Sequence, residues 1–282
     1  MVTPPLPKIL ILGFGALGRA LAKRHGPRYE CRGIKRTPLA SAPCPVVPMS
    51  ISDAEIVDHL AWADHIVFCP APSSSDLDAY RATYLDNMVS IIARMAEHRI
   101  RPRSILLISS TGVYPESMGE FIDETQRPEV ETERQEILLQ TERALIDSGL
   151  PYVVLRCGGL YGEGRGDFRA RVADGRITSA MLSHQFVHFI HLNDVCDAVD
   201  LAIRRNVTGE IFNLVDDSQI RRADFYRFLS SLYGLPIPDN GPAPEVVSDR
   251  LISNAKAKSQ LGLTLSSPRI TDYLQKETAS PS

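Results

Sequence analysis

The chain has 282 residues, 44% of them hydrophobic, which is sufficient for one large or two modest cores. Its formal net charge of -3 at pH 7 argues against general binding to nucleic acids or anionic membranes, and no apolar run is long enough to span a bilayer. Residues 1–7 lack the pattern of a secretion signal and the five cysteines contain no C-x-x-C pair, so we expect a cytoplasmic protein with reduced thiols and no metal site.

The first predicted elements are a strand, a glycine-rich turn and a helix. An apolar run at residues 8–12 leads directly into the pattern G-x-G-x-x-G at 13–18, and helical spacing continues to residue 25. In this order the glycines favour a dinucleotide site, because the start of such a helix presents free N–H groups to a pyrophosphate. The alternative is an ordinary glycine-rich turn between a strand and a helix.

Each glycine of this turn has a separate expected role. Gly13 permits the tight turn out of the strand, Gly15 leaves room for a pyrophosphate beside the backbone, and Gly18 lets the helix pack closely on the strand. We therefore predict that a cofactor lies against the whole turn, which comprises Gly13, Phe14, Gly15, Ala16, Leu17 and Gly18.

Apolar runs and helical patterns then alternate along the first two-thirds of the chain. This alternation predicts an α/β fold with a Rossmann-type, doubly wound parallel sheet that helices cover on both faces. We expect Asp194 to be the N-cap of the last of these helices. The predicted strands are residues 29–34, 44–48, 65–69, 104–109, 152–156 and 209–215, and the predicted helices are 53–61, 76–99, 131–148 and 194–205.

The character of the sequence changes after residue 216. The patterns there predict a helix at 222–233, a loop at 234–244, a short helix near 253–261 and a frayed tail from 277. We predict two domains, an NADP-binding Rossmann domain and a smaller, mostly C-terminal substrate-binding domain. The first comprises residues 1–157 and 186–215, and the second comprises residues 158–185 and 216–282.

Ligands of open parallel sheets bind beyond the carboxyl ends of the strands. Besides the glycine turn, we expect Lys35 and Arg36 there after the second strand, Pro70 and Ala71 after the fourth, and Ser109 at the end of the fifth. Basic residues stand where NAD-binding Rossmann proteins carry an acid for the ribose 2′-OH, so we predict a 2′-phosphate site and a preference for NADP. The alternative is a solvated basic turn, which leaves NAD open as a cofactor.

Four further motifs follow the glycine turn. They are I-S-S-T-G-V-Y at residues 108–114, L-R-C-G-G-L-Y-G at 155–162, I-H-L-N-D-V at 190–195 and G-E-I-F-N-L at 209–214. In these segments the chain resembles the extended short-chain dehydrogenases/reductases, often labelled the NAD-dependent epimerase/dehydratase family. The resemblance covers most of the chain and implies an NAD(P)-dependent oxidoreductase that acts on a small anionic or sugar-like substrate.

The sequence departs from this family at its catalytic Y-x-x-x-K pair. The helix that should carry the pair, residues 131–148, contains no Tyr and no Lys. If Glu142 is the glutamate that usually follows the pair, Arg134 stands at the tyrosine's position and Leu138 at the lysine's. The chain is thereby identified as an atypical member, and the usual proton transfer is in doubt because Arg cannot donate a proton near neutral pH.

The resemblance also implies candidates near the reacting groups. Ser110 stands at the family's catalytic serine with Thr111 beside it, and either hydroxyl is suited to hydrogen-bond a substrate carbonyl or hydroxyl. The alternative is that they cap the end of the strand. By motif, the nearest phenols are Tyr114 and Tyr161. Either could replace the missing tyrosine as a proton donor, and Tyr161 could contact the substrate. For each of them, however, a role in packing is favoured.

Arginines are expected at the mouth of the substrate cleft. In the family, the segment after the Y-G motif lies there. We predict that Arg165 from this segment and Arg134 from the preceding helix bind a carboxylate or phosphate of the substrate, since an unpaired cation in a partly closed cleft is costly. A solvated, charged helix face is the alternative. The full set after the motif is Arg165, Arg169, Arg171 and Arg176.

These observations predict an NAD(P)-dependent epimerase, dehydratase or reductase with a small-molecule substrate, present as a monomer or a homodimer. The missing Tyr-Lys pair leaves a second hypothesis open. The chain could instead be a non-catalytic NADP-binding redox sensor or regulator that has kept the fold.

Overall fold

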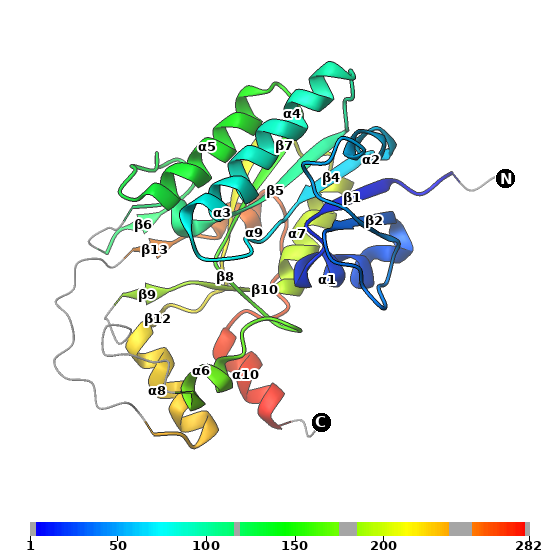
Figure 1. The fold of residues 1–282 in the computed structure, drawn as a ribbon. Coiled ribbons are helices and arrows are strands. Elements are labelled where there is room, and N and C mark those ends of the chain that lie inside the picture. Colours follow the sequence, from blue (N-terminus) through cyan, green and yellow to red (C-terminus); the bar gives the residue numbers. More distant parts are fainter. Residues whose placement is uncertain (1–3, 116–118, 175–184, 237–249, 280–282) are drawn as a thin grey trace.

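A parallel sheet of seven strands forms the centre of the computed structural model, which describes residues 4–115, 119–174, 185–236 and 250–279 (Figure 1). The strands lie in the order β11-β7-β5-β4-β1-β2-β3, and each neighbouring pair is parallel. This arrangement confirms the predicted doubly wound, Rossmann-type sheet. The strands are β1 Lys8–Leu12, β2 Glu30–Lys35, β3 Val46–Pro48, β4 His65–Phe68, β5 Ser104–Ser110, β7 Tyr152–Cys157 and β11 Glu210–Leu214.

Helices cover both faces of the sheet (Figure 1). One layer consists of α2 (Ile56–Trp62), α3 (Leu77–Arg81), α4 (Asn87–Glu97) and α5 (Glu133–Asp147). The other consists of α1 (Ala16–His25), α7 (Leu192–Arg204) and α9 (Ala255–Ser259). Two 3-10 turns, η1 (Gly26–Arg28) and η3 (Thr111–Val113), follow α1 and β5. Within the described ranges, no helix combines the length and apolarity that a membrane span requires.

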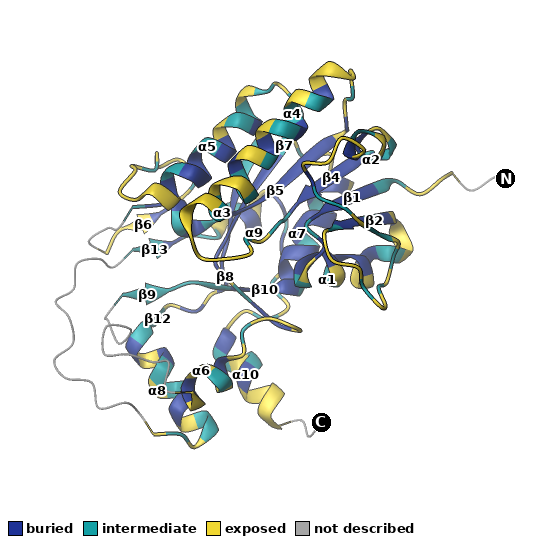
Figure 2. Cartoon of the chain, in the orientation of Figure 1, coloured by how far each residue is buried: buried dark blue, intermediate teal, exposed yellow. Residues whose placement is uncertain are grey.

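The side chains of each central strand alternate between two buried cores. In β1, Ile9 and Ile11 pack in the core under α1 and α7, whereas Leu10 and Leu12 pack in the core under α2 and α4. Figure 2 shows the strands buried between the layers and the outer surfaces of α4 and α5 exposed. Because both faces are covered, the strands read as uninterrupted apolar runs rather than as alternating ones.

A smaller lobe lies beyond the carboxyl edge of the sheet (Figure 1). Its core is aromatic, and the rings of Phe168 and Phe225 meet edge to face with centroids 5.3 Å apart. Its strands have only two or three residues, too few to show a period in the sequence. The elements are β8 (Gly159–Tyr161), β9 (Phe186–Val187), β10 (Phe189–His191), β12 (Ile220–Arg221), α6 (Phe168–Ala173), α8 (Arg222–Tyr233) and α10 (Ile270–Ala279), and the parallel pair β6 (Phe121–Ile122) and β13 (Leu251–Ile252) lies nearer the main sheet.

The helix predicted over residues 76–99 is interrupted. Asp76 caps α3 by accepting a hydrogen bond from the Ala79 N–H at 2.7 Å, and α4 ends at Glu97. Between α3 and α4 the chain makes a π-helical turn, η2 (Ala82–Asp86). Such turns are rare and are frequently found at functional sites.

Three further expectations differ from the structure after residue 190. Asp194 is not the N-cap of α7, because the His191 side chain accepts the capping hydrogen bond from the Asn193 N–H. Asp194 is fully buried and accepts hydrogen bonds from the Ser266 N–H and hydroxyl at 2.7 and 2.5 Å. Three residues that the sequence predicts for the smaller domain, Ala257, Leu261 and Leu263, pack in the core under α1 and α7. The tail predicted from residue 277 is helical to residue 279.

A buried polar network joins β5, α5, β7 and β11. The Arg156 guanidinium pairs with the Glu142 carboxylate at 2.7 Å, and Glu142 also accepts a hydrogen bond from the Ser109 hydroxyl at 2.5 Å. Arg156 donates to the Tyr114 hydroxyl at 2.8 Å, which donates in turn to the Asn213 side-chain carbonyl at 2.8 Å. All five side chains are buried, so each depends on the others for its hydrogen bonds.

We predict that Arg156→Ala lowers the free energy of unfolding by about 3–5 kcal/mol, because it leaves the Glu142 carboxylate buried and unpaired. The control is Arg227→Ala, which removes a salt bridge to Asp224 whose side chains are 59% and 55% exposed and should cost about 0–1 kcal/mol. Urea unfolding of both variants measures the difference. Equal destabilisation would show that the network does not support the sheet.

Candidate functional site

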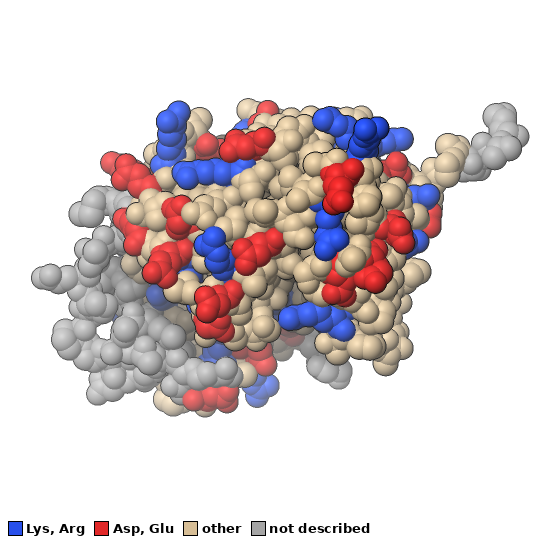
Figure 3. All heavy atoms as spheres, turned by 45° about the horizontal axis from the view of Figure 1, so that its top comes forward, with Lys and Arg blue, Asp and Glu red and all other residues tan. Residues whose placement is uncertain are grey.

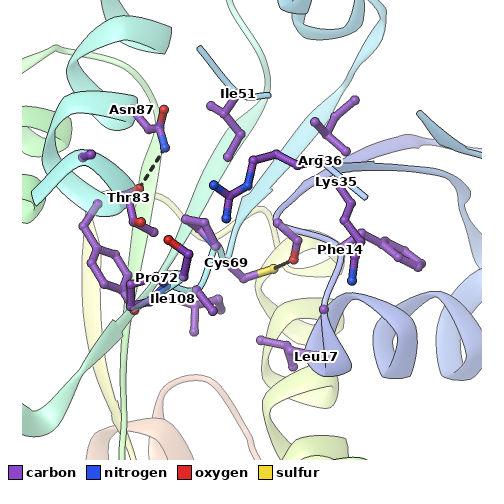
Figure 4. Close-up of a pocket in the computed structure, with 18 of the residues that line it drawn as sticks. Phe14, Leu17, Lys35, Arg36, Ile51, Cys69, Pro72, Thr83, Asn87 and Ile108 are labelled. Atoms are coloured by element: carbon purple, nitrogen blue, oxygen red, sulfur yellow. Dashed lines mark hydrogen bonds between the residues drawn. The ribbon is translucent and has the colours of Figure 1, made fainter. Parts of the chain in front are cut away.

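A cavity of ≈ 880 Å³ opens at the carboxyl edge of the sheet, above the point where β1 and β4 are neighbours (Figure 4). The chain crosses from one half of the sheet to the other at this point, which is where ligands of doubly wound sheets bind. The volume is typical of a cofactor or small-molecule site. Its wall includes most of the predicted residues, namely Gly13, Phe14, Gly15, Ala16, Leu17, Lys35, Arg36, Pro70, Ala71, Ser109, Ser110 and Arg165.

The glycine turn gives this cavity an open phosphate-binding end. Gly13 has φ +93°, and a Cβ there would lie 2.4 Å from the Pro70 Cα, so no side chain fits. A Cβ on Gly15 would meet nothing within 4 Å, and α1 begins without a side-chain cap or an acid in its first turn. The leading amides of α1 are therefore left for an anionic ligand, and this open space fits the phosphates of a dinucleotide.

Gly18 and the Phe14 ring contribute to packing. A Cβ on Gly18 would lie 2.9 Å from the Ile11 side chain, and Gly18 is absent from the cavity wall, which agrees with the predicted close packing of helix on strand. The Phe14 ring is buried against Gly33 and points away from the cavity in Figure 4. The Phe14 N–H is bonded to the Ile34 carbonyl at 2.9 Å.

The end of β2 supplies the basic side of the cavity. Lys35 and Arg36 both line it, and the Arg36 guanidinium points into it (Figure 4). Within the described residues, neither side chain has an ion pair or hydrogen bond. With Arg165, they make three cations against one acid, Asp86, among the described residues of the wall. On the molecular face that Figure 3 shows, the two signs are intermixed.

The three hydroxyls at the end of β5 differ in their access to the cavity. Ser110 lines it, and its Oγ accepts a hydrogen bond from the Gly112 N–H at 3.0 Å, which leaves its proton free to be donated. Ser109 also lines the cavity, but its proton is committed to Glu142. Thr111 is buried, lies outside the wall and donates to the Cys157 carbonyl at 3.4 Å. Ser110 is therefore the hydroxyl of this segment that faces a substrate.

Neither phenol predicted as a substitute proton donor lines the cavity. Tyr114 is fully buried in the polar network, and burial raises the pKa of its hydroxyl. Tyr161 is fully buried in the smaller lobe, where its hydroxyl donates to the Ser267 carbonyl at 3.2 Å. Both tyrosines therefore have the role in packing that the sequence analysis favoured. The catalytic role expected for Tyr114 and the substrate contact expected for Tyr161 do not fit these positions.

The inner face of α5 contributes an apolar side chain to the cavity, because Leu138 lines it. Arg134, one turn earlier, lies outside the wall. Its guanidinium donates to the Ser75 carbonyl and lies 5.1 Å from the centre of the Tyr80 ring. Arg134 is thus an exposed residue outside the cavity wall, bonded to the Ser75 loop, and the catalytic role and substrate contact expected for it do not fit this position.

Sequence reasoning missed a phenol and a thiol in the wall. Tyr84 comes from the π-helical turn, and its hydroxyl makes no hydrogen bond to any described residue. Burial raises the pKa of Tyr84, and the Arg165 guanidinium opposes that rise. Cys69 follows β4 and donates a hydrogen bond to the Gly13 carbonyl at 3.4 Å, while burial raises the pKa of its thiol to about 12. Cys69 is therefore a neutral thiol near pH 7 and not a nucleophile.

Of the four arginines after the Y-G motif, Arg165 alone among the described three lines the cavity. Arg169 is exposed outside it, and the Arg171 guanidinium lies 6.0 Å from the centre of the Phe168 ring. Arg176 falls outside the described residues. The Arg165 side chain has no hydrogen-bond or ion-pair partner among the described residues, which leaves its guanidinium for a ligand.

Comparisons with known proteins agree with this geometry. A family model described as NAD(P)H-binding matches residues 15–188. Protein YeeZ of Escherichia coli strain K12 is 28% identical over 274 residues, which cover 93% of this chain and 96% of that protein. Among solved structures, a UDP-glucose 4-epimerase of Thermotoga maritima, determined with UDP-glucose, has a TM-score of 0.78 and 18% identity, with 96% of this chain and 97% of that one covered. A UDP-glucuronic acid 4-epimerase of Bacillus cereus, in complex with UDP-glucuronic acid and NAD, has a TM-score of 0.78 and 18% identity, with 96% and 98% covered.

Gly15→Ala and Gly13→Ala should separate ligand binding from folding. Gly15→Ala has space for its methyl group in the unliganded protein, so we predict an unchanged melting temperature and NADPH affinity at least about tenfold weaker, because the methyl group enters the phosphate site. Gly13→Ala should lower the melting temperature itself, because of its positive φ and its overlap with Pro70. Thermal melting and fluorescence titration measure the two effects. Full NADPH affinity in Gly15→Ala would place the phosphates elsewhere.

Proposed function

The chain belongs to the NAD(P)H-binding family, and on that premise we propose that it is an NADP-dependent oxidoreductase of the epimerase/dehydratase type that acts on a small anionic or sugar-like molecule. One observation carries the proposal: a single cavity joins the open start of α1, the free Arg36 guanidinium and the Ser110 hydroxyl. A dinucleotide bound along this line would supply hydride transfer at the Ser110 end.

The side chains of the cavity divide into two groups in this proposal. The start of α1 and Arg36 bind the phosphates of the cofactor, and NADP is preferred to NAD because the guanidinium forms a bidentate pair with a 2′-phosphate. Ser110 donates its proton to a carbonyl oxygen of the substrate or receives a hydrogen bond from its hydroxyl. The smaller lobe, whose strand β8 contributes Leu160 to the cavity wall, would hold the rest of the substrate.

The substrate class rests on charge and on the structural relatives. The cavity wall has an excess of cations, which favours an anionic ligand. The solved relatives from Thermotoga maritima and Bacillus cereus were determined with sugar nucleotides. We therefore propose sugar nucleotides and related phosphorylated sugars as the first substrates to test.

A redox sensor or regulator is the second candidate function. Leu138 in the cavity wall favours it, since α5 places no lysine at this position to lower the pKa of a proton donor. If the protein binds NADPH and NADP⁺ with different affinities but turns over no sugar nucleotide, this alternative is supported over the enzyme.

We predict that NADPH binds more tightly than NADH and that Arg36→Ala removes most of the difference. A charge-assisted bidentate contact contributes about 1.5–3 kcal/mol, which corresponds to about a tenfold to a hundredfold change in affinity. Calorimetry of both nucleotides with wild type and variant measures the effect. NADH affinity should be unchanged in Arg36→Ala. Equal affinities of the two nucleotides in the wild type would contradict the assignment.

Turnover should depend on Ser110. With NADP⁺ or NADPH and a panel of sugar nucleotides, followed by absorbance of the reduced nicotinamide and by product analysis, Ser110→Ala should lower kcat by about 10²–10³, as expected for loss of a hydrogen-bond donor at the reacting oxygen. Thr111→Val removes the neighbouring hydroxyl outside the cavity and should keep most of the rate. Turnover that survives Ser110→Ala would mean that the reacting end of the cavity is misassigned.

A further inference from the structure

A glycine-rich turn of the smaller lobe, residues 162–166, lies over the start of α1. Gly162, Gly164 and Gly166 have φ values of +119°, +76° and +74°, a conformation that side chains disfavour. The Arg165 N–H closes the turn by donating to the Gly162 carbonyl at 2.9 Å. The turn is therefore compact, and Arg165 is its one long side chain that enters the cavity.

Two contacts attach this turn to α1. The Lys23 amine of α1 forms a salt bridge with Glu163 at 2.9 Å. A Cβ on Gly164 would lie 3.9 Å from the Ala16 Cβ, so the backbone of the turn is in contact distance of the first residue of α1. Both attachments immediately precede Arg165, an exposed residue that lines the cavity, so the backbone that carries its side chain lies beside the start of α1.

The surroundings of the Arg165 guanidinium lack a partner for its charge. It lines the cavity together with Tyr84 and Cys69, which are uncharged near pH 7. Among the described residues, no carboxylate pairs with it. The open start of α1 is a site for an anion, and the turn contacts its first residue, Ala16, through Gly164.

We propose that Arg165 binds the pyrophosphate of the dinucleotide, so that the turn at 162–166 holds the cofactor from the smaller lobe while α1 holds it from the Rossmann lobe. The proposal rests on the proposed NADP binding and reassigns Arg165 from the substrate to the cofactor. A planar guanidinium is suited to this position, because it can bridge oxygens of two adjacent phosphates. Arg36 and Arg165 then bind different phosphates of one ligand.

Ligand fragments separate these two arginines. Calorimetry with NADPH, with 2′-phospho-ADP-ribose and with 2′-AMP, which lacks the pyrophosphate, should be carried out on wild type, Arg165→Ala, Arg165→Lys and Arg36→Ala. We expect Arg165→Ala to weaken NADPH and 2′-phospho-ADP-ribose about tenfold to a hundredfold and to leave 2′-AMP within twofold. Arg165→Lys should lose less, because it keeps the charge. Arg36→Ala should weaken all three ligands.

Two controls test the geometry. Arg169→Ala removes a charge from the same stretch outside the cavity and should leave all three affinities unchanged. Glu163→Gln removes the salt bridge to Lys23 and should weaken NADPH by about two- to fivefold, as expected for an exposed pair. Without ligand, Arg165→Ala should melt at the wild-type temperature. A lower melting temperature would reveal a structural partner and overturn the proposal.

The outcomes distinguish this inference from the function on which it rests. If wild type binds neither NADPH nor 2′-phospho-ADP-ribose, dinucleotide binding itself fails, and the inference fails with it. If wild type binds both and Arg165→Ala binds them equally well, NADP binding stands, and Arg165 faces the substrate as the sequence predicted. Equal weakening of 2′-AMP by Arg165→Ala would also overturn the assignment to the pyrophosphate.

Discussion

The contact between Gly13 and Pro70 is the constraint on which the candidate site depends. A Cβ at Gly13 would lie 2.4 Å from the Pro70 Cα, so the ends of β1 and β4 come together only because residue 13 has no side chain. The Cys69 N–H completes the junction by donating to the Leu12 carbonyl at 2.8 Å. This junction sets the floor of the cavity. It also positions the start of α1 toward the cavity that Arg36 and Arg165 line.

The family-like motifs mark the scaffold more than the chemistry. Three of the motifs that carry the resemblance contribute side chains to one buried network around Glu142. These side chains are Ser109, Tyr114, Arg156 and Asn213. Loss of a partner inside such a network is costly, so these four side chains support the fold independently of any reaction. A match to these motifs is therefore direct support for the fold. It supports the proposed reaction only because one of the matched residues, Ser110, faces the cavity.

The alternation of apolar runs and helical patterns is sufficient to predict the parallel sheet, because both of its faces are buried. The smaller lobe could not be predicted in the same way, since strands such as β9 and β12 have two residues and no period. The cavity positions of Gly15, Arg36 and Ser110 follow from strand ends. Tyr84 could not be found from the sequence, because a π-helical turn shifts side-chain directions without a residue signature.

That π-helical turn has a consequence for how this architecture can change. It holds one more residue per turn than an α-helix, so side chains on its two sides are rotated by about 100° relative to an unbroken helix. This offset sets the positions of three side chains relative to one another. They are Thr83 and Tyr84 in the cavity wall and Tyr80, whose ring lies beside Arg134. In evolutionary terms, gain or loss of a single residue between α3 and α4 would redirect one wall of the cavity, and ligand preference could diverge while the sheet kept its sequence.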